Sequence, residues 1–147
     1  MWDIVTAASC FIDVLIYGSY TTDHTMESHL TLGDGRFGLA SASLGYYWKH
    51  YIGHDPLADR NPLAAPLEGS FHGLPPLFVI SGGLDPVRDE SRSLAAKLAL
   101  AGQAVEYREY AGLVHGFMHY YAQIGSAAHA VATIGEYLAR HLAPADN

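Results

Sequence analysis

The chain has 147 residues, of which 50% are hydrophobic and 16% are charged, a composition typical of one globular domain and not of a disordered segment. Its formal net charge is −7 and its 8 Lys and Arg residues are scattered, so we expect neither nucleic acid nor an anionic membrane as a partner. Cys10 is the single cysteine, which excludes an intrachain disulfide and is more typical of a small core residue than of a reactive thiol.

The amino-terminal stretch is apolar but lacks the features of a targeting segment. It contains Asp3 and Asp13 and no Lys or Arg before Gly18, which does not fit the charge pattern of a signal peptide. No run approaches the roughly 18 apolar residues that a membrane-spanning helix needs. We therefore expect a soluble, cytoplasmic chain, and we expect residues 143–147 to form a tail.

A strand is the first element that the sequence predicts. Residues 11–17, FIDVLIY, are rich in β-branched and aromatic side chains and end at Gly18. Residues 20–36 are polar and show no sustained periodicity, so they predict a loop.

Residues 39–52 predict a helix that ends at Gly53 as its C-cap. Its apolar side chains recur at helical spacing and fall on one face: Leu44, Tyr47, Trp48 and Tyr51. An aromatic face of this kind is more typical of a helix packed in the core than of a substrate-pocket wall, although one helix can do both.

Residues 54–76 are rich in proline and predict extended and turn segments on the surface. The apolar run 77–80 that follows suits a strand buried on both faces, which is predicted over residues 77–81. The next helix is predicted to run to about Ala101, before Gly102, and to bury one stripe: Leu94, Ala95, Leu98 and Ala101.

Two further elements complete the chain. Residues 104–110 alternate with the period of two that is typical of a strand with one wetter face, as at the edge of a sheet. Residues 126–141 predict a final helix with one apolar stripe, made of Ala127, Ala130, Val131, Ile134, Tyr137 and Leu138.

Asp85 and His115 are the candidate catalytic residues, because each follows one of two predicted strands. About 30 residues separate them, the length of one βαβ unit, so parallel neighbouring strands would bring both to the same edge of the sheet. A carboxylate on the far nitrogen of an imidazole fixes its tautomer and stabilises the cation that forms when it takes a proton. Each residue also has an ordinary explanation: Asp85 before Pro86 suits a helix start, and His115 suits an exposed loop.

Two motifs carry a family resemblance. Residues 85–90 read DPVRDE, His115 is followed by Gly116 and Phe117, and a helix lies between them. Together these motifs resemble the α/β-hydrolase superfamily and, within it, the hormone-sensitive-lipase-like carboxylesterases, over roughly residues 11–141. The resemblance implies an α/β fold with about three parallel strands and flanking helices, and hydrolysis of carboxylic esters through a serine ester intermediate.

The resemblance also implies roles for single residues. Asp85 and His115 would be the acid and base of a Ser-Asp-His triad that needs no cofactor. Candidates for the substrate pocket are Val87, Phe117, Tyr47 and Trp48. Asp89, the second carboxylate of the motif, is expected to bind Arg88 or backbone amides and not the imidazole.

The serine of such a triad is missing from the sequence. Neither the family's G-x-S-x-G pattern nor its upstream H-G-G-G oxyanion loop occurs in the chain, and the family's Tyr-Pro pair after the first strand reads Tyr17-Gly18. In the family the serine precedes the Asp and the His. We therefore interpret residues 1–147 as the carboxyl-terminal part of a hydrolase domain with an incomplete sheet, in which residues 1–10 match the family poorly.

Two functions remain open at this point. As an esterase part, the chain would bind a small-molecule ester only when completed by the nucleophile half, and alone it should be inactive. The alternative is a non-catalytic pseudoenzyme fragment or an interaction module. In either case we expect the exposed edge of the first strand to pair with another copy or with the missing half.

A metal site is not expected, although the chain has 9 His residues. Two pairs have helical i, i+4 spacing, His50 with His54 and His115 with His119. Neither pair contains the Glu of H-E-x-x-H, and His115 lies in a predicted loop.

Overall fold

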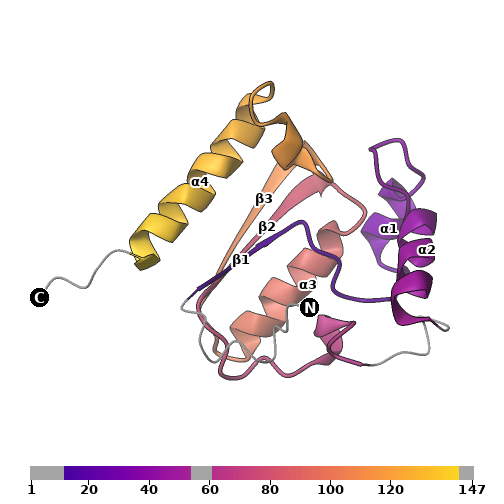
Figure 1. The fold of residues 1–147 in the computed structure, drawn as a ribbon, viewed down its shortest axis with the longest axis horizontal. Coiled ribbons are helices and arrows are strands. Elements are labelled where there is room, and N and C mark those ends of the chain that lie inside the picture. Colours follow the sequence, from indigo (N-terminus) through magenta and orange to yellow (C-terminus); the bar gives the residue numbers. More distant parts are fainter. Residues whose placement is uncertain (1–11, 54–60, 143–147) are drawn as a thin grey trace, which may run out of the picture.

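The computed structural model describes residues 12–53 and 61–142. Predictions for residues 1–11, for 54–60 and for the tail at 143–147 lie outside the described residues. A parallel sheet of three strands forms the centre, with helices on both faces (Figure 1). Its strands are β1 (Asp13–Ile16), β2 (Leu77–Leu84) and β3 (Val105–Val114), side by side in that order. The predicted α/β fold with about three parallel strands is therefore confirmed.

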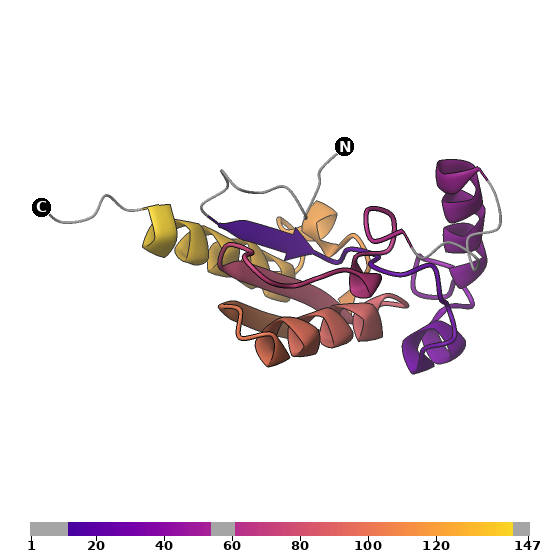
Figure 2. The same ribbon diagram turned by 90° about the horizontal axis from the view of Figure 1, so that it is seen from below.

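The central strand β2 is buried on both faces, which explains its unbroken apolar sequence. Phe78 and Ile80 pack with the residues of α4 (Gly125–Leu142), whereas Leu77 and Val79 pack with those of α3 (Arg88–Leu100). Figure 2 shows the two helices on opposite sides of the sheet. Most residues of the two predicted stripes supply this packing, but Ala95, Ala101 and Val131 belong to neither cluster.

β2 is longer than predicted, because a glycine pair continues the strand. A Cβ at Gly82 would lie 2.4 Å from the carbonyl oxygen of Leu113, and a Cβ at Gly83 would lie 2.6 Å from the Cα of Ala111. Both obstacles are backbone atoms of β3, so only glycine lets the two strands approach so closely. β3 likewise extends to Val114, and the register between the strands shifts near this contact.

The prediction of a loop over residues 20–36 is wrong in part, because this segment contains helix α1 (Glu27–Leu32). The helix has no apolar stripe that the sequence could reveal. It is held by polar contacts: the Ser28 hydroxyl donates to the Pro86 carbonyl at 2.6 Å, and the Ser28 N–H donates to Asp89 at 2.9 Å.

Helix α2 (Ser41–Ile52) ends at Gly53 as predicted, with a φ of 83° and an N–H that donates to the Lys49 carbonyl. The interpretation of its aromatic face as core is wrong, since none of its residues is buried. Tyr47 is 61% exposed and Tyr51 is 66% exposed. α2 lies beside α1, to one side of the sheet and away from α4 (Figure 1).

Candidate active site

Asp85 and His115 meet at the carboxyl ends of β2 and β3. The Nδ1 atom of His115 lies 2.9 Å from the Oδ2 atom of Asp85. This places the two side chains within the hydrogen-bond distance that the βαβ spacing predicted. In the described part of the chain, the His115 ring has this one hydrogen bond, so Nε2 has no hydrogen-bonding partner.

The surroundings of Asp85 fix the tautomer of His115. Asp85 is completely buried, and its other oxygen accepts the N–H of Val87 at 3.0 Å. A carboxylate can only accept, so with Asp85 ionised and the imidazole neutral, Nδ1 of His115 carries the proton and Nε2 keeps a free lone pair. The His115 side chain is 31% exposed. Nε2 of His115 thus lies on the open side of the pair, and the buried carboxylate of Asp85 lies on the other side.

Asp85 lies in the turn that leads into α3 and not at the N-cap position that the Asp-Pro sequence suggested. Helix α3 begins at Arg88, and Val87 occupies its N-cap position. The carboxylate of Asp85 instead closes a turn onto the Val87 N–H, two residues along the chain. This turn orients the second carboxylate oxygen toward His115.

Asp89 binds elsewhere, as predicted. One of its oxygens accepts from the Arg88 guanidinium at 2.8 Å, and the other accepts from the Ser28 N–H at 2.9 Å. Burial acts to raise the pKa of Asp89, but the hydrogen bonds from Arg88 and Ser28 outweigh it and hold that pKa below its usual range. Asp89 therefore anchors α1 to α3 and makes no contact with the imidazole.

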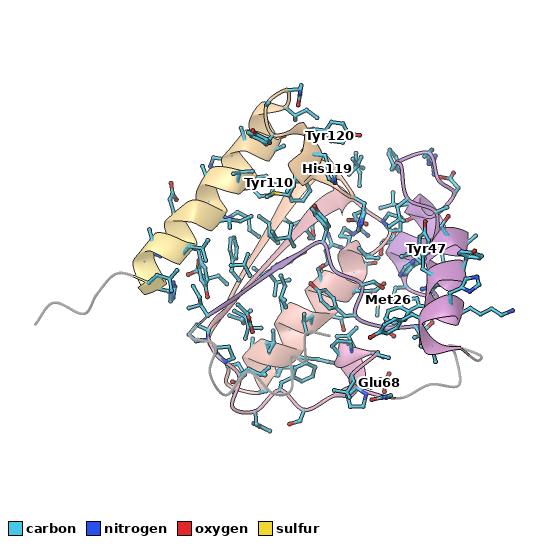
Figure 3. All side chains as sticks on the ribbon, viewed as in Figure 1. Met26, Tyr47, Glu68, Tyr110, His119 and Tyr120 are labelled. Carbon is cyan, nitrogen blue, oxygen red and sulfur yellow. The ribbon has the colours of Figure 1, made fainter. Side chains whose placement is uncertain are left out.

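One aromatic ring packs against the His115 imidazole, and a second ring packs against the first. The Tyr17 ring, at the end of β1, lies 4.9 Å from the imidazole centroid, and Phe117 lies 5.1 Å from Tyr17. Burial, and then the nearby charge of Asp85, raise the pKa of Tyr17 above its usual range. Figure 3 shows Tyr110, His119 and Tyr120 grouped at the end of β3 and the turn after it.

A buried carboxylate beside the site, Glu90, is a feature that sequence reasoning missed. Glu90 is 0% exposed, and one of its oxygens accepts the backbone N–H groups of Tyr20 and Thr21. Its other oxygen lies 2.8 Å from Nε2 of His29, whose Nδ1 lies 3.0 Å from the Ser41 hydroxyl. Glu90 therefore connects α3 to the segment after β1, to α1 and to the start of α2. An acidic residue in the first turn of an apparently exposed helix gave no signal of this role.

The four predicted pocket residues fall into two places. The aromatic face of α2 lines an open cavity of about 410 Å³, together with residues of the segment after β1 and of the segment at 63–66. Its lining residues are Ser19, Tyr20, Leu44, Tyr47, Trp48, Tyr51, Leu63, Ala64 and Pro66. Val87 and Phe117 do not line this cavity, and both are 0% exposed. The structure thus separates Tyr47 and Trp48 from Val87 and Phe117.

A comparison with known protein families shows the family to which the chain belongs. A family model described as alpha/beta hydrolase fold matches residues 10–119. The chain belongs to the α/β-hydrolase fold family. This confirms the family that the motifs at Asp85 and His115 suggested.

Curated relatives of the chain are named as hydrolases. It is 30% identical over 123 residues to the carboxylic ester hydrolase LipN of Mycobacterium tuberculosis, an alignment that covers 82% of this chain and 33% of LipN. It is also 30% identical over 112 residues to an acetyl-hydrolase of Streptomyces hygroscopicus, covering 76% of this chain and 36% of that protein. The chain thus spans about a third of the length of these relatives.

Solved esterase structures share the arrangement. EstE1, a thermophilic carboxylesterase cloned from a metagenomic library, superposes with a TM-score of 0.85 at 26% identity, covering 91% of this chain and 46% of EstE1. A Rhizomucor miehei esterase superposes with a TM-score of 0.83 at 26% identity, covering 89% and 42% of the two chains. In the described part of the chain, no helix is both long and apolar enough to cross a membrane.

Proposed function

We propose that this chain supplies the acid and base of a serine carboxylic-ester hydrolase, as the carboxyl-terminal part of its catalytic domain. The observation that carries the proposal is the 2.9 Å contact between Nδ1 of His115 and a fully buried Asp85. A buried anion on one ring nitrogen and an open lone pair on the other are what a general base for a serine hydroxyl needs.

The chemistry assigned to the pair runs in two stages. Nε2 of His115 takes the proton of a serine hydroxyl while the serine oxygen attacks the ester carbonyl carbon, and Asp85 stabilises the imidazolium that forms. The imidazolium then donates its proton to the departing alkoxide. In the second stage the same nitrogen takes a proton from water while the water oxygen attacks the serine ester, and it then returns that proton to the serine oxygen as the acid leaves. The serine and the oxyanion hole come from a segment that these 147 residues do not contain.

The cavity along α2 is the proposed binding site for part of the ester. Among the described residues, no charged side chain lines it, and Tyr47, Trp48 and Tyr51 form one wall. Ser19, which also lines it, is two residues from Tyr17, whose ring contacts His115. Such a wall favours an uncharged, apolar group of the ester.

The partner proposed for the chain is the nucleophile-bearing segment, paired with β1. Within residues 12–53 and 61–142, β1 pairs with β2 alone, and all four of its residues stay partly exposed. Val14, Leu15 and Ile16 carry no charge, and such an edge is a template for another strand. The chain alone should therefore self-associate, which size-exclusion chromatography with light scattering over a range of concentrations measures. A monodisperse monomer of 15.9 kDa would contradict this expectation.

A chimera tests the proposed function. This chain replaces the matched third of the M. tuberculosis carboxylic ester hydrolase, and hydrolysis of a short p-nitrophenyl ester is followed. We expect turnover that a serine-directed phosphonate blocks and that His115→Ala abolishes, whereas His119→Ala, at an exposed His nearby, retains it. The chain alone should not exceed the rate of free imidazole.

A folded but inactive chimera, or one whose activity survives His115→Ala, would contradict the proposal. Full inactivity in a folded chimera would favour the alternative of a non-catalytic module that uses the β1 edge. Robust phosphonate-sensitive turnover by the chain alone would mean that one of its own serines is the nucleophile.

A further inference from the structure

Tyr17 has a backbone conformation that is rare for a bulky residue. Its φ is 40°, and within residues 12–53 and 61–142 it is the one non-glycine residue with a positive φ. Such outliers persist only where the surrounding structure imposes them, and they gather at functional sites. The positive φ of Tyr17 is explained by the contacts of the chain just before and just after it.

Before the bend, Tyr17 is still part of the sheet, since its N–H donates to the Ile80 carbonyl at 2.8 Å. After the bend, the chain is held by the buried Glu90 carboxylate. That carboxylate accepts the Ser19 hydroxyl at 3.1 Å and the backbone N–H groups of Tyr20 and Thr21. Because Glu90 also binds His29, it is fixed between α3 and α1 and cannot follow a relaxing loop.

Gly18 completes the bend. A Cβ at this position would lie 2.6 Å from the ring of Tyr20, which is itself 4% exposed. A side chain at this position, such as the proline of the family's Tyr-Pro pair, would require the buried Tyr20 ring to move. Tyr17 therefore keeps its positive φ, because its N–H is bonded to Ile80 of β2 and the residues after it are bonded to Glu90.

The bend places the Tyr17 ring against His115. The two ring centroids are 4.9 Å apart with planes at 59°, and Phe117 supports Tyr17 from the side at 5.1 Å and 79°. The hydrogen bond to Asp85 fixes only one atom of the imidazole. The tilted Tyr17 ring beside the imidazole limits its rotation and keeps it from turning out of that bond.

We infer that Tyr17 is a positioning residue for His115: its imposed backbone holds an aromatic ring against the imidazole, which keeps Nδ1 on Asp85 and Nε2 available as the base. Tyr17 itself takes no part in proton transfer. The catalytic consequence rests on the proposed function, but the geometric claim applies to the chain as it is. It is measured without substrate or nucleophile.

The test uses histidine-labelled chain and the nuclear magnetic resonance signals of the His115 ring, at a pH above the ordinary range of histidine. Tyr17→Gly removes the aromatic ring, and glycine adopts a positive φ without strain. A change in the His115 signals then reports the loss of the ring and not the loss of a favourable backbone. We expect this variant to exchange the His115 Nδ1 proton with water about threefold to tenfold faster, the range expected from losing one aromatic contact, and to mix the two ring tautomers. Tyr17→Phe keeps the ring and should match the parent.

Tyr110→Leu is the matched control, because Tyr110 lies 6.3 Å from Phe117 in the same aromatic group and forms no ring contact with His115. It should leave the His115 signals unchanged. A Tyr17→Gly chain with parental exchange and one tautomer would overturn the inference, and so would an equal effect of Tyr110→Leu.

If circular dichroism shows that Tyr17→Gly does not fold, Tyr17→Leu takes its place with the same expected and contrary results. An inactive chimera would contradict the proposed function but not the inference about Tyr17, because the exchange measurement needs no catalysis. Parental His115 signals in Tyr17→Gly or its substitute Tyr17→Leu would contradict the inference but not the proposed function.

Discussion

Replacing Glu90 by alanine removes one carboxylate from four partners in the interior. Its oxygens accept the backbone N–H groups of Tyr20 and Thr21 and the Ser19 hydroxyl, and one of them pairs with His29. The Glu90 and His29 side chains are both 0% exposed, so water does not replace the lost acceptor without local opening. The change tests whether this carboxylate holds α1, α3 and the segment after β1 together.

The cost follows from the donors left behind. An unsatisfied buried donor costs about 1 to 3 kcal/mol, and partial entry of water lowers the sum for the two N–H groups and His29. We expect Glu90→Ala to lower the free energy of unfolding by about 3 to 5 kcal/mol, the range for breaking a buried pair from one side. A domain has roughly 5 to 15 kcal/mol in total, so this variant should lose a large share of its stability.

Two further variants, Glu90→Gln and Glu27→Ala, serve as controls for Glu90→Ala. The glutamine keeps one carbonyl oxygen for the two backbone donors and should cost about 1 to 2 kcal/mol. Glu27 forms a surface ion pair with Arg88 and is 65% exposed, so its removal should change stability by less than about 1 kcal/mol. Urea unfolding is followed by circular dichroism at one fixed protein concentration, because self-association would shift the midpoint. Equal midpoints for Glu90→Ala and Glu27→Ala would refute the reasoning.

Two further predictions concern pH and strand contact. Burial, and then the neighbouring His29, lower the pKa of His24, so the unfolded chain binds this proton more tightly. Stability should therefore fall as pH drops below about 6.5, toward the lowered folded value. His24→Asn should flatten that fall in urea midpoints, and His50→Asn, at an exposed position, should not. Gly83→Ala should cost about 1 to 3 kcal/mol, since its Cβ meets the β3 backbone, whereas Gly112→Ala, which meets nothing within 4 Å, should be nearly neutral in the same assay.

The sheet and the Asp85–His115 contact were predictable because both follow from local pattern and chain topology. An unbroken apolar run gives a buried strand, and one βαβ crossover brings the ends of two parallel strands together. The motif then indicated which Asp and which His would meet. A distance of 2.9 Å agrees with that reasoning.

The contacts around α1 were not predictable because they join residues that are distant in sequence. Ser28 binds Pro86 and Asp89, and Glu90 binds the segment after β1; no periodicity marks such pairs. Periodicity did find α2, but it reports that one face is apolar and not what that face contacts. The face of α2 borders an open cavity, so its aromatic residues stay exposed.

The length of β2 shows a different limit. A Gly-Gly pair is a turn signal in most sequences, and the strand was predicted to end before it. At Gly82 and Gly83 the pair has another cause, the approach of the β3 backbone to within 3 Å of where a Cβ would lie. Sequence alone does not distinguish a bend from a close contact between strands.

The central claim is that Asp85 and His115 act as one catalytic unit, and a double-mutant cycle in the chimera tests it most directly. The rate constant for p-nitrophenyl ester cleavage is measured for Asp85→Asn, His115→Ala and the double variant. Members of a triad act together, so each single change should lower kcat by about a thousandfold or more, and the double variant should be no slower than His115→Ala alone. Losses that multiply in the double variant, or an Asp85→Asn chimera with the parental kcat, would contradict the account.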